Sequence, residues 1–297
     1  LLYYSIVSRK LVLFLQGKEI ATKILIPNGP RLLRRGSKIE PLHVQDLESV
    51  DEEFLRIRSE MGLEDARGKI TPPQERVWKY FYPRKLLEFY YATNNEGAGK
   101  PIERIFFDID RKEVPRNDAQ QVCRKLIELI KDDSEFQNLI GRNVIFPMWT
   151  GNSFHIYILL EKPVSHDFYD KYLQFSKDDP LGNFTGRWAD EINRSLPVKV
   201  TGGHEKEEGR INIDPSQTPS GKLARAPFSL HLKDARNVDG VAIPLTEEML
   251  EDKNLGKISQ IKMDSPKTLK AVWETVYPPQ IYLIIACLLY TSPSPRD

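Results

Sequence analysis

The sequence is poor in cysteine, in net charge and in long apolar runs. Its 297 residues contain two cysteines, Cys123 and Cys287, which are too few for a cysteine-based zinc site or a disulfide framework. Low cysteine usage is typical of a reducing intracellular compartment, so we expect a cytoplasmic location. The formal net charge is +1, so no overall basic field indicates a nucleic-acid partner, although cations can still gather in one groove. The longest apolar run near the end, Ile281–Tyr290, is too short to span a bilayer, and no membrane partner is expected.

The two ends of the chain contribute little to a functional interpretation. The opening stretch places Arg9 and Lys10 among apolar residues and has no small-residue cleavage site, so we do not interpret it as a signal peptide. The final residues, Cys287–Asp297, read CLLYTSPSPRD and resemble a translated sequencing-library adapter. We therefore expect this segment to be an artefact and the segment 251–286 before it to be truncated. A genuine Pro/Ser tail is the alternative.

The first part of the chain gives weak structural signals. The apolar stretches of Leu1–Ile26 could form strands, and Asn28–Gly36 is a Pro/Gly/Arg-rich break. Helical spacing follows over Asp46–Met61, and Thr71-Pro72-Pro73 interrupts the chain. We treat residues 1–71 as an N-terminal α/β extension of uncertain fold.

The central region has a clearer pattern of alternating strands and helices. The predicted order is a strand over Ile102–Asp110, a helix over Asn117–Lys131, a hairpin over Asn143–Leu160, a helix over Thr185–Leu196, and short strands over Val198–Thr201, Arg210–Asp214 and Val241–Leu245. This order is expected of an α+β palm, in which an RRM-like antiparallel sheet carries helices on one face and its site on the other. The predicted core covers residues 72–250.

Three aspartates are candidate metal ligands. Asp108 and Asp110 end the first strand, and residues two apart on a strand share a face, so both carboxylates project together. Like charges side by side repel unless cations neutralise them, and hard divalent cations favour carboxylate oxygens. Asp214 ends Ile211–Asp214, which the sheet could bring beside the first strand. The alternatives are a strand end running into a polar turn for the first pair and an ordinary turn residue before Pro215 for Asp214.

Four further side chains are candidates for phosphate binding. Ser153 and His155 share the polar face of the second hairpin strand. Arg225 could bind a triphosphate in bidentate fashion, and His231 follows it in an extended segment. The alternatives are a structural histidine beside a hairpin, a surface arginine and a turn histidine.

Taken in order, these segments resemble the archaeo-eukaryotic primase superfamily, and most of all the primase small subunit of archaea and eukaryotes. The segments are FFDID ending at Asp110, TGNSFHIYI from Thr150, INID ending at Asp214 and KLARAPFSLH ending at His231. The likeness covers roughly Pro72–Leu245, and the last segment is the most telling. The Ser-Gly start of the family's second motif and its zinc-binding cysteine cluster are absent.

The resemblance implies a role for each candidate residue. Asp108 and Asp110 match the first motif, Asp214 completes the metal site, and two Mg²⁺ or Mn²⁺ ions are the implied cofactors, with no zinc site. Ser153 and His155 match the second motif, and Arg225 and His231 the later basic residue and histidine, all of which contact the incoming nucleotide.

The implied function is primer synthesis by a DNA-templated nucleotidyl transferase, a DNA primase acting on a single-stranded template with NTP or dNTP. A primase large subunit or helicase is a possible partner, the protein would be nucleoid-associated, and environmental archaea or their mobile elements are plausible hosts. Two alternatives stay open. The first is a repair or end-joining polymerase of the same superfamily, and the second is a non-catalytic accessory or DNA-binding module.

Overall fold

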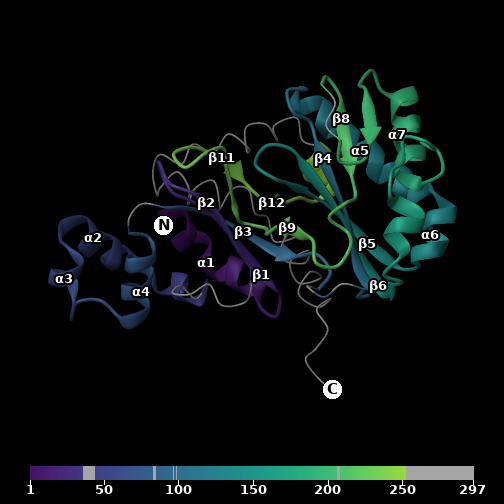
Figure 1. Ribbon diagram of the computed structural model, residues 1–297. Helices are drawn as coiled ribbons and strands as arrows, with labels where there is room; N and C mark the ends of the chain where they lie inside the picture. The colour runs from purple at the N-terminus through teal and green to yellow at the C-terminus, as the bar shows by residue number, and fades with distance from the viewer. Residues whose placement is uncertain (36–43, 83–84, 96, 98, 206–207, 252–297) are drawn as a thin grey trace.

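The computed structural model describes residues 1–35, 44–82, 85–95, 97, 99–205 and 208–251. The interpretations of residues 252–297 as a truncated segment and an adapter lie outside these residues. Two sheets dominate the α+β fold (Figure 1). The six-stranded sheet has the order β12 (Ile243–Pro244), β5 (Asn143–Trp149), β6 (Phe154–Val164), β4 (Ile102–Asp110), β8 (Ile211–Asp214), β7 (Val200–Gly202). The four-stranded sheet has the order β2 (Arg31–Arg35), β1 (Ile20–Leu25), β3 (Leu86–Ala92), β9 (Leu223–Arg225).

The remaining elements cover or connect these sheets. A two-stranded ribbon pairs β10 (Leu230–Leu232) with β11 (Val238–Val241). The helical elements are α1 (Leu2–Leu15), η1 (Val44–Ser49), α2 (Glu52–Glu60), α3 (Leu63–Ala66), α4 (Pro72–Tyr80), α5 (Arg116–Asp132), α6 (Ser134–Ile140), η2 (Tyr169–Leu173), α7 (Phe184–Ser195) and α8 (Glu247–Glu251). Among the described residues, none of these helices has the length and apolar character to cross a membrane.

One face of the six-stranded sheet is closed by helices. Side chains alternate along a strand, so Ile105, Phe107 and Ile109 of β4 share a face, and all three are fully buried. The Phe107 ring lies 5.9 Å from that of Trp188 on α7. Helices α5, α6 and α7 gather on this side of the sheet (Figure 1). The other predicted strands and helices of this region are confirmed within one or two residues, but β6 extends the predicted hairpin by four residues to Val164. The strand predicted over Val241–Leu245 is divided between the end of β11 and β12.

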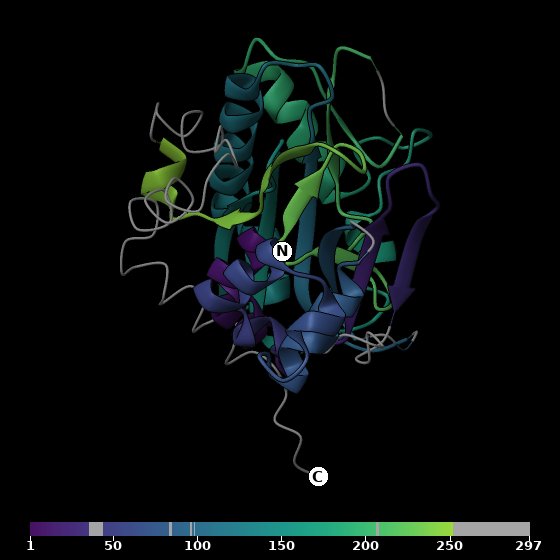
Figure 2. The same cartoon turned by 90° about the vertical axis from the view of Figure 1, so that its left-hand side faces the viewer.

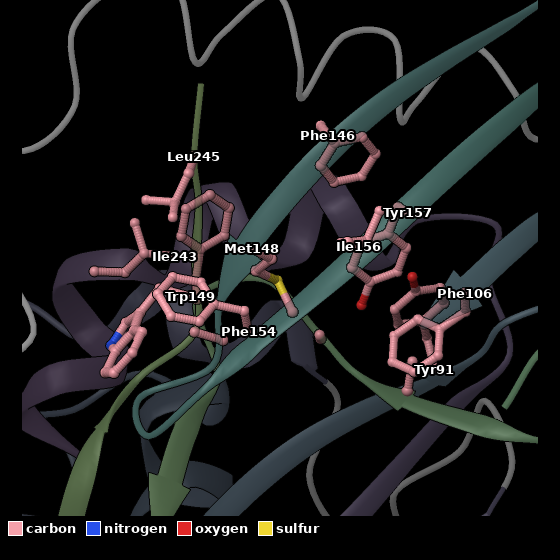
Figure 3. Packing of buried hydrophobic residues seen from close by; sticks show 14 of the residues in the cluster. Tyr91, Phe106, Phe146, Met148, Trp149, Phe154, Ile156, Tyr157, Ile243 and Leu245 are labelled. Atoms are coloured by element: carbon pink, nitrogen blue, oxygen red, sulfur yellow. The ribbon is translucent and has the colours of Figure 1, made fainter. Parts of the chain in front are cut away.

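On the opposite face of β4, an aromatic cluster lies next to the carboxylates. Phe106 packs edge-on against Tyr157 of β6 at 5.0 Å between ring centroids, and Tyr157 stacks on Phe146 of β5. Tyr91 of β3 lies beside this cluster and links the two sheets (Figure 3). Beyond Phe106 the same face continues with Asp108, where the carboxylates begin.

The start of the chain forms a helix, so the prediction of strands within Leu1–Ile26 is wrong for its first part. Residues Tyr4, Val7, Leu11 and Phe14 are buried at helical spacing. This stripe packs on β3, with the Tyr4 and Phe14 rings each 5.0 Å from an aromatic ring of that strand. A continuous apolar run does not distinguish a buried helix from a buried strand.

The four-stranded sheet joins residues on both sides of position 71. Strand β1 pairs with β3 in antiparallel register from Ile20↔Tyr91 to Leu25↔Leu86. The predicted break at Thr71 begins α4, because Thr71 and Gln74 form a capping box. The single helical stretch predicted over Asp46–Met61 divides into η1 and α2, and Asp51 caps α2 by accepting a hydrogen bond from Phe54 N at 2.7 Å.

Candidate active site

Three strands of the six-stranded sheet bring the predicted residues together. Strand β4 lies between β6 and β8, and its Asp108 is directly opposite His155 on one side and Asp214 on the other. Directly opposed side chains of antiparallel strands share a face with Cβ atoms about 4.5–5.5 Å apart. Asp110 lies two residues further along the same face, opposite Asn212. The ladder register therefore places all three aspartates on one side of the sheet.

The aspartates lie at the wall of a cavity of about 590 Å³. Asp108 is 38% exposed at its side chain, and its Oδ1 lies 3.5 Å from Nε2 of His155. Asp214 is oriented by Ser216, whose backbone N–H and hydroxyl each donate to the carboxylate at 2.8 Å. The other lining residues include Tyr169, Gln174, His204 and Lys222. Only His204 and Lys222 among these four can carry positive charge, and both are exposed.

The carboxylates form an open row rather than a closed metal cage. Among the described residues, no group of three or more His, Cys, Asp or Glu side chains is gathered closely enough to enclose an ion by itself. Zinc sites have at least three such protein ligands. Mg²⁺ instead keeps several waters and is bound through one or two carboxylates plus substrate phosphates. An open pair of opposed aspartates with a third two residues away fits this second kind of site.

His155 is buried beside Asp108 and neutral at physiological pH. Burial lowers the pKa of its imidazole well below 6.5, and the charge of Arg225 lowers it further. The Phe106 ring packs edge-on against it at 4.7 Å between centroids. Within the described chain, Nδ1 is buried and has no hydrogen-bond partner. A buried imidazole nitrogen without a partner is costly.

The Ser153 hydroxyl is already engaged in the fold. It donates to the backbone carbonyl of Ile109, and the Ser153 N–H donates to the Thr150 hydroxyl at 3.0 Å. These bonds tie the β5–β6 turn to the end of β4. In this structure Ser153 therefore fixes the position of the aspartate strand.

Arg225 does not line the aspartate cavity. It lies on β9 of the four-stranded sheet, and its Nη1 donates to Glu88 Oε1 at 2.5 Å and to the carbonyl of Leu230 at 2.9 Å. The ring of Tyr90 lies 5.2 Å from the guanidinium. The two sheets meet here, because the Tyr157 hydroxyl donates to the Arg225 carbonyl at 3.4 Å.

His231 lies close to Arg225 and is also outside the lining of the cavity. Its Nδ1 lies 3.1 Å from the carbonyl of Thr150, which can only accept, so Nδ1 carries the proton. Burial lowers the pKa of His231 to about 4, with a further contribution from Arg225. In the neutral ring Nε2 is therefore an acceptor, and a contact with a phosphate oxygen requires the protonated form.

Sequence reasoning missed Glu88, which holds this second cluster together. Its carboxylate is fully buried and accepts from Lys23, Arg225 and the backbone N–H of Leu232. Burial raises its pKa, but the charge of Arg225 and the bond from Lys23 outweigh this and lower the value to about 2. The sequence did contain one indication of a buried charge, because Glu88 is the single acidic residue within the apolar run of β3.

A comparison with solved structures finds a similar fold in a polymerase domain. The polymerase domain from Mycobacterium tuberculosis Ligase D in complex with DNA aligns over 92% of this chain and 86% of its own, with a TM-score of 0.53 and 20% identity. The chain has the fold of that polymerase domain. No family model and no curated protein matches the sequence. The predicted primase-polymerase architecture is thereby confirmed at the level of fold.

Proposed function

We propose that the protein is a DNA-templated nucleotidyl transferase that synthesises primers, like a primase small subunit. The observation that carries the proposal is the register of β4 against β8, which sets Asp108 opposite Asp214 with Asp110 on the same face. The four sequence motifs support it, and so does a fold shared with a polymerase domain whose structure was solved in complex with DNA.

The chain's own residues would bind and orient the reactants. Divalent ions, when bound to the aspartates, would supply charge neutralisation at the phosphates and favour ionisation of the attacking 3′-hydroxyl. Ser216 holds the Asp214 carboxylate in one orientation, and neutral His155 lies against Asp108. Arg225, His155 and His231 lie close to one another beside the cavity rather than in its lining, and we propose that they would contact the triphosphate. Catalysis by such a site is mainly positioning and electrostatics.

The first test removes the aspartates. Asp108→Ala and Asp110→Ala should each abolish nucleotide incorporation on a single-stranded DNA template, because the carboxylate row loses ligands that no neighbour replaces. Incorporation is measured with labelled NTP or dNTP, with and without Mn²⁺. Asp132→Ala is the matched control, since Asp132 is an exposed carboxylate on α5. Normal primer synthesis by either active-site variant, with an unchanged thermal midpoint, refutes the assignment.

A second candidate is extension of existing ends rather than synthesis of new chains. It is favoured by the solved structure above, whose polymerase domain belongs to a ligase. Templates offered with and without an annealed primer separate the two activities. Product from the unprimed template supports priming, and product from the primed template alone supports end extension.

A further inference from the structure

Two hairpins outside the aspartate cavity carry a group of exposed cations. We use the name basic rim for Arg31 and Arg35 of β2 together with Lys233 and Arg236 of the β10–β11 turn; all four are exposed. The hairpins touch, because Arg236 Nη2 donates to Oδ1 of Asn28 in the β1–β2 turn at 3.2 Å. Strand β2 is the edge of its sheet and lies at the margin of the molecule, with β11 beside it (Figures 1 and 2).

The basic rim differs from several of the exposed helices in how its charges are balanced. On the helices, exposed cations such as Arg56, Lys171 and Arg194 form ion pairs with carboxylates one turn away. Within the described residues, no member of the basic rim forms such a salt bridge. The nearby Asp234 is occupied by the backbone N–H groups of Arg236 and Asn237 in its own turn. The four cations of the rim outnumber Asp234 and Asp239, the two exposed carboxylates of the same hairpins, so the rim presents net positive charge to solvent.

The sheet beneath the basic rim offers more than charge. Arg31, Leu33 and Arg35 alternate with the other residues of β2 and share one face. Leu33 is 55% exposed on that face. Tyr90 of β3 and Arg35 both lie opposite Ala21, so the half-buried Tyr90 ring is on the same face. Cations interspersed with apolar and aromatic side chains are typical of surfaces that bind single strands, with phosphates on the cations and bases on the apolar groups.

The rim is continuous with the aspartate cavity. Nη1 of Arg35 donates to the carbonyl of Gly221 at 3.1 Å. The next residue, Lys222, is exposed and lines the cavity that contains Asp108. Charges on an edge strand also discourage edge-to-edge association, but that role does not account for Lys233 and Arg236 on the other hairpin.

We propose that the basic rim binds single-stranded DNA template and leads it past Lys222 to the aspartates. The inference rests on the proposed templated synthesis and adds the path of the template. The four cations bind backbone phosphates, while Leu33 and Tyr90 contact bases. Affinity for DNA should therefore depend on the rim and fall with rising salt.

The test uses Arg31→Ala/Lys233→Ala, because neither side chain makes a hydrogen bond or salt bridge within the described residues. Binding of a fluorescent single-stranded oligonucleotide is followed by anisotropy over a range of salt concentrations, without nucleotide or metal. We expect roughly tenfold weaker binding at low salt and a salt slope lower by about 1.4, which is about 0.7 for each lost phosphate contact. Arg56→Ala/Arg194→Ala removes the same charge from the helices and should bind normally.

Unchanged affinity and slope in the rim variant, or an equal loss in the helix control, would overturn the proposal. A duplex competitor that displaces the oligonucleotide as well as a single strand does would overturn the single-strand assignment. This test is separate from the test of the proposed function, because DNA binding is measured without catalysis. In an active protein, the rim variant should show a raised KM for template with kcat and the KM for nucleotide unchanged.

Discussion

Glu88 shows how strongly one buried residue can control this fold. Its carboxylate is fully buried between Lys23 and Arg225. Glu88→Gln keeps the volume but leaves two cations without their anion, and breaking a buried charge network typically lowers stability by about 3–5 kcal/mol. Urea unfolding followed by circular dichroism measures the loss. Glu53→Gln on α2, an exposed partner of Arg56, should change the unfolding midpoint little. An equally small effect at Glu88 would show that the network does not stabilise the protein.

The shared face of the first two aspartates could be predicted, because it depends only on residues adjacent in sequence. Asp108 and Asp110 alternate at the end of one apolar strand, and this places both on one face without further information. The environment of Arg225 was not predictable, because it depends on Glu88 and Leu230 from other strands. The sequence motif alone suggested an arginine that faces the nucleotide, whereas the structure shows that one of its nitrogens is held by a buried carboxylate.

Among the elements, the β5–β6 turn is packed closely against the β10–β11 ribbon. Gly151 has φ of +98°, and a Cβ there would lie 2.8 Å from Cβ of His231 and 2.9 Å from the carbonyl carbon of Gly240. Gly151→Ala should therefore lower stability by about 2–5 kcal/mol, from backbone strain and from displacement of β10. Thermal unfolding provides the measurement.

Gly209→Ala is the matched control for this turn, because Gly209 also has positive φ at +69° but nothing within 4 Å of a Cβ. We expect it to cost only about 1–2 kcal/mol, the strain alone. Equal losses in the two variants would mean that the close approach to β10 is unimportant.

Element prediction succeeded where periodicity was strong and failed where it was ambiguous. Strand β4 was predicted with the bounds that it has, because its apolar run ends abruptly at the carboxylates. Helix α1 was missed, because its sequence is apolar on nearly all sides and contains β-branched and aromatic residues that also suit strands.

For the whole molecule, stability should fall in mild acid. The folded protein holds His231 neutral with a pKa of about 4, against an ordinary value of 6.5. As pH drops below 6.5, the unfolded chain takes up a proton that the folded protein does not bind until about pH 4. At pH 5 this difference amounts to about 2 kcal/mol. His231→Gln should therefore lose less stability than wild type between pH 7 and pH 5, as measured by urea unfolding at each pH.

The exposed His166 provides the comparison for that measurement. His166→Gln should retain the wild-type dependence of stability on pH. A His231→Gln variant that loses stability as steeply as wild type would show that this histidine is not held neutral by the fold.

For the whole molecule, the α+β architecture of the core could be predicted, but the strand pairing of the N-terminal region could not. The order of strands and helices after residue 100 specifies a sheet covered on one face. Nothing local in β1 indicates that it pairs with β3 across the helices between them. Such pairings depend on contacts between residues distant in sequence.

The pairing of β9 with β3 has a consequence for synthesis on the ribosome. Glu88 and Lys23 emerge before Arg225, which lies on a strand made later. Until Arg225 has left the exit tunnel, the nascent N-terminal sheet carries an anion with one of its two cationic partners missing. We therefore expect this sheet to close only when the segment around Arg225 has been made and docks on it.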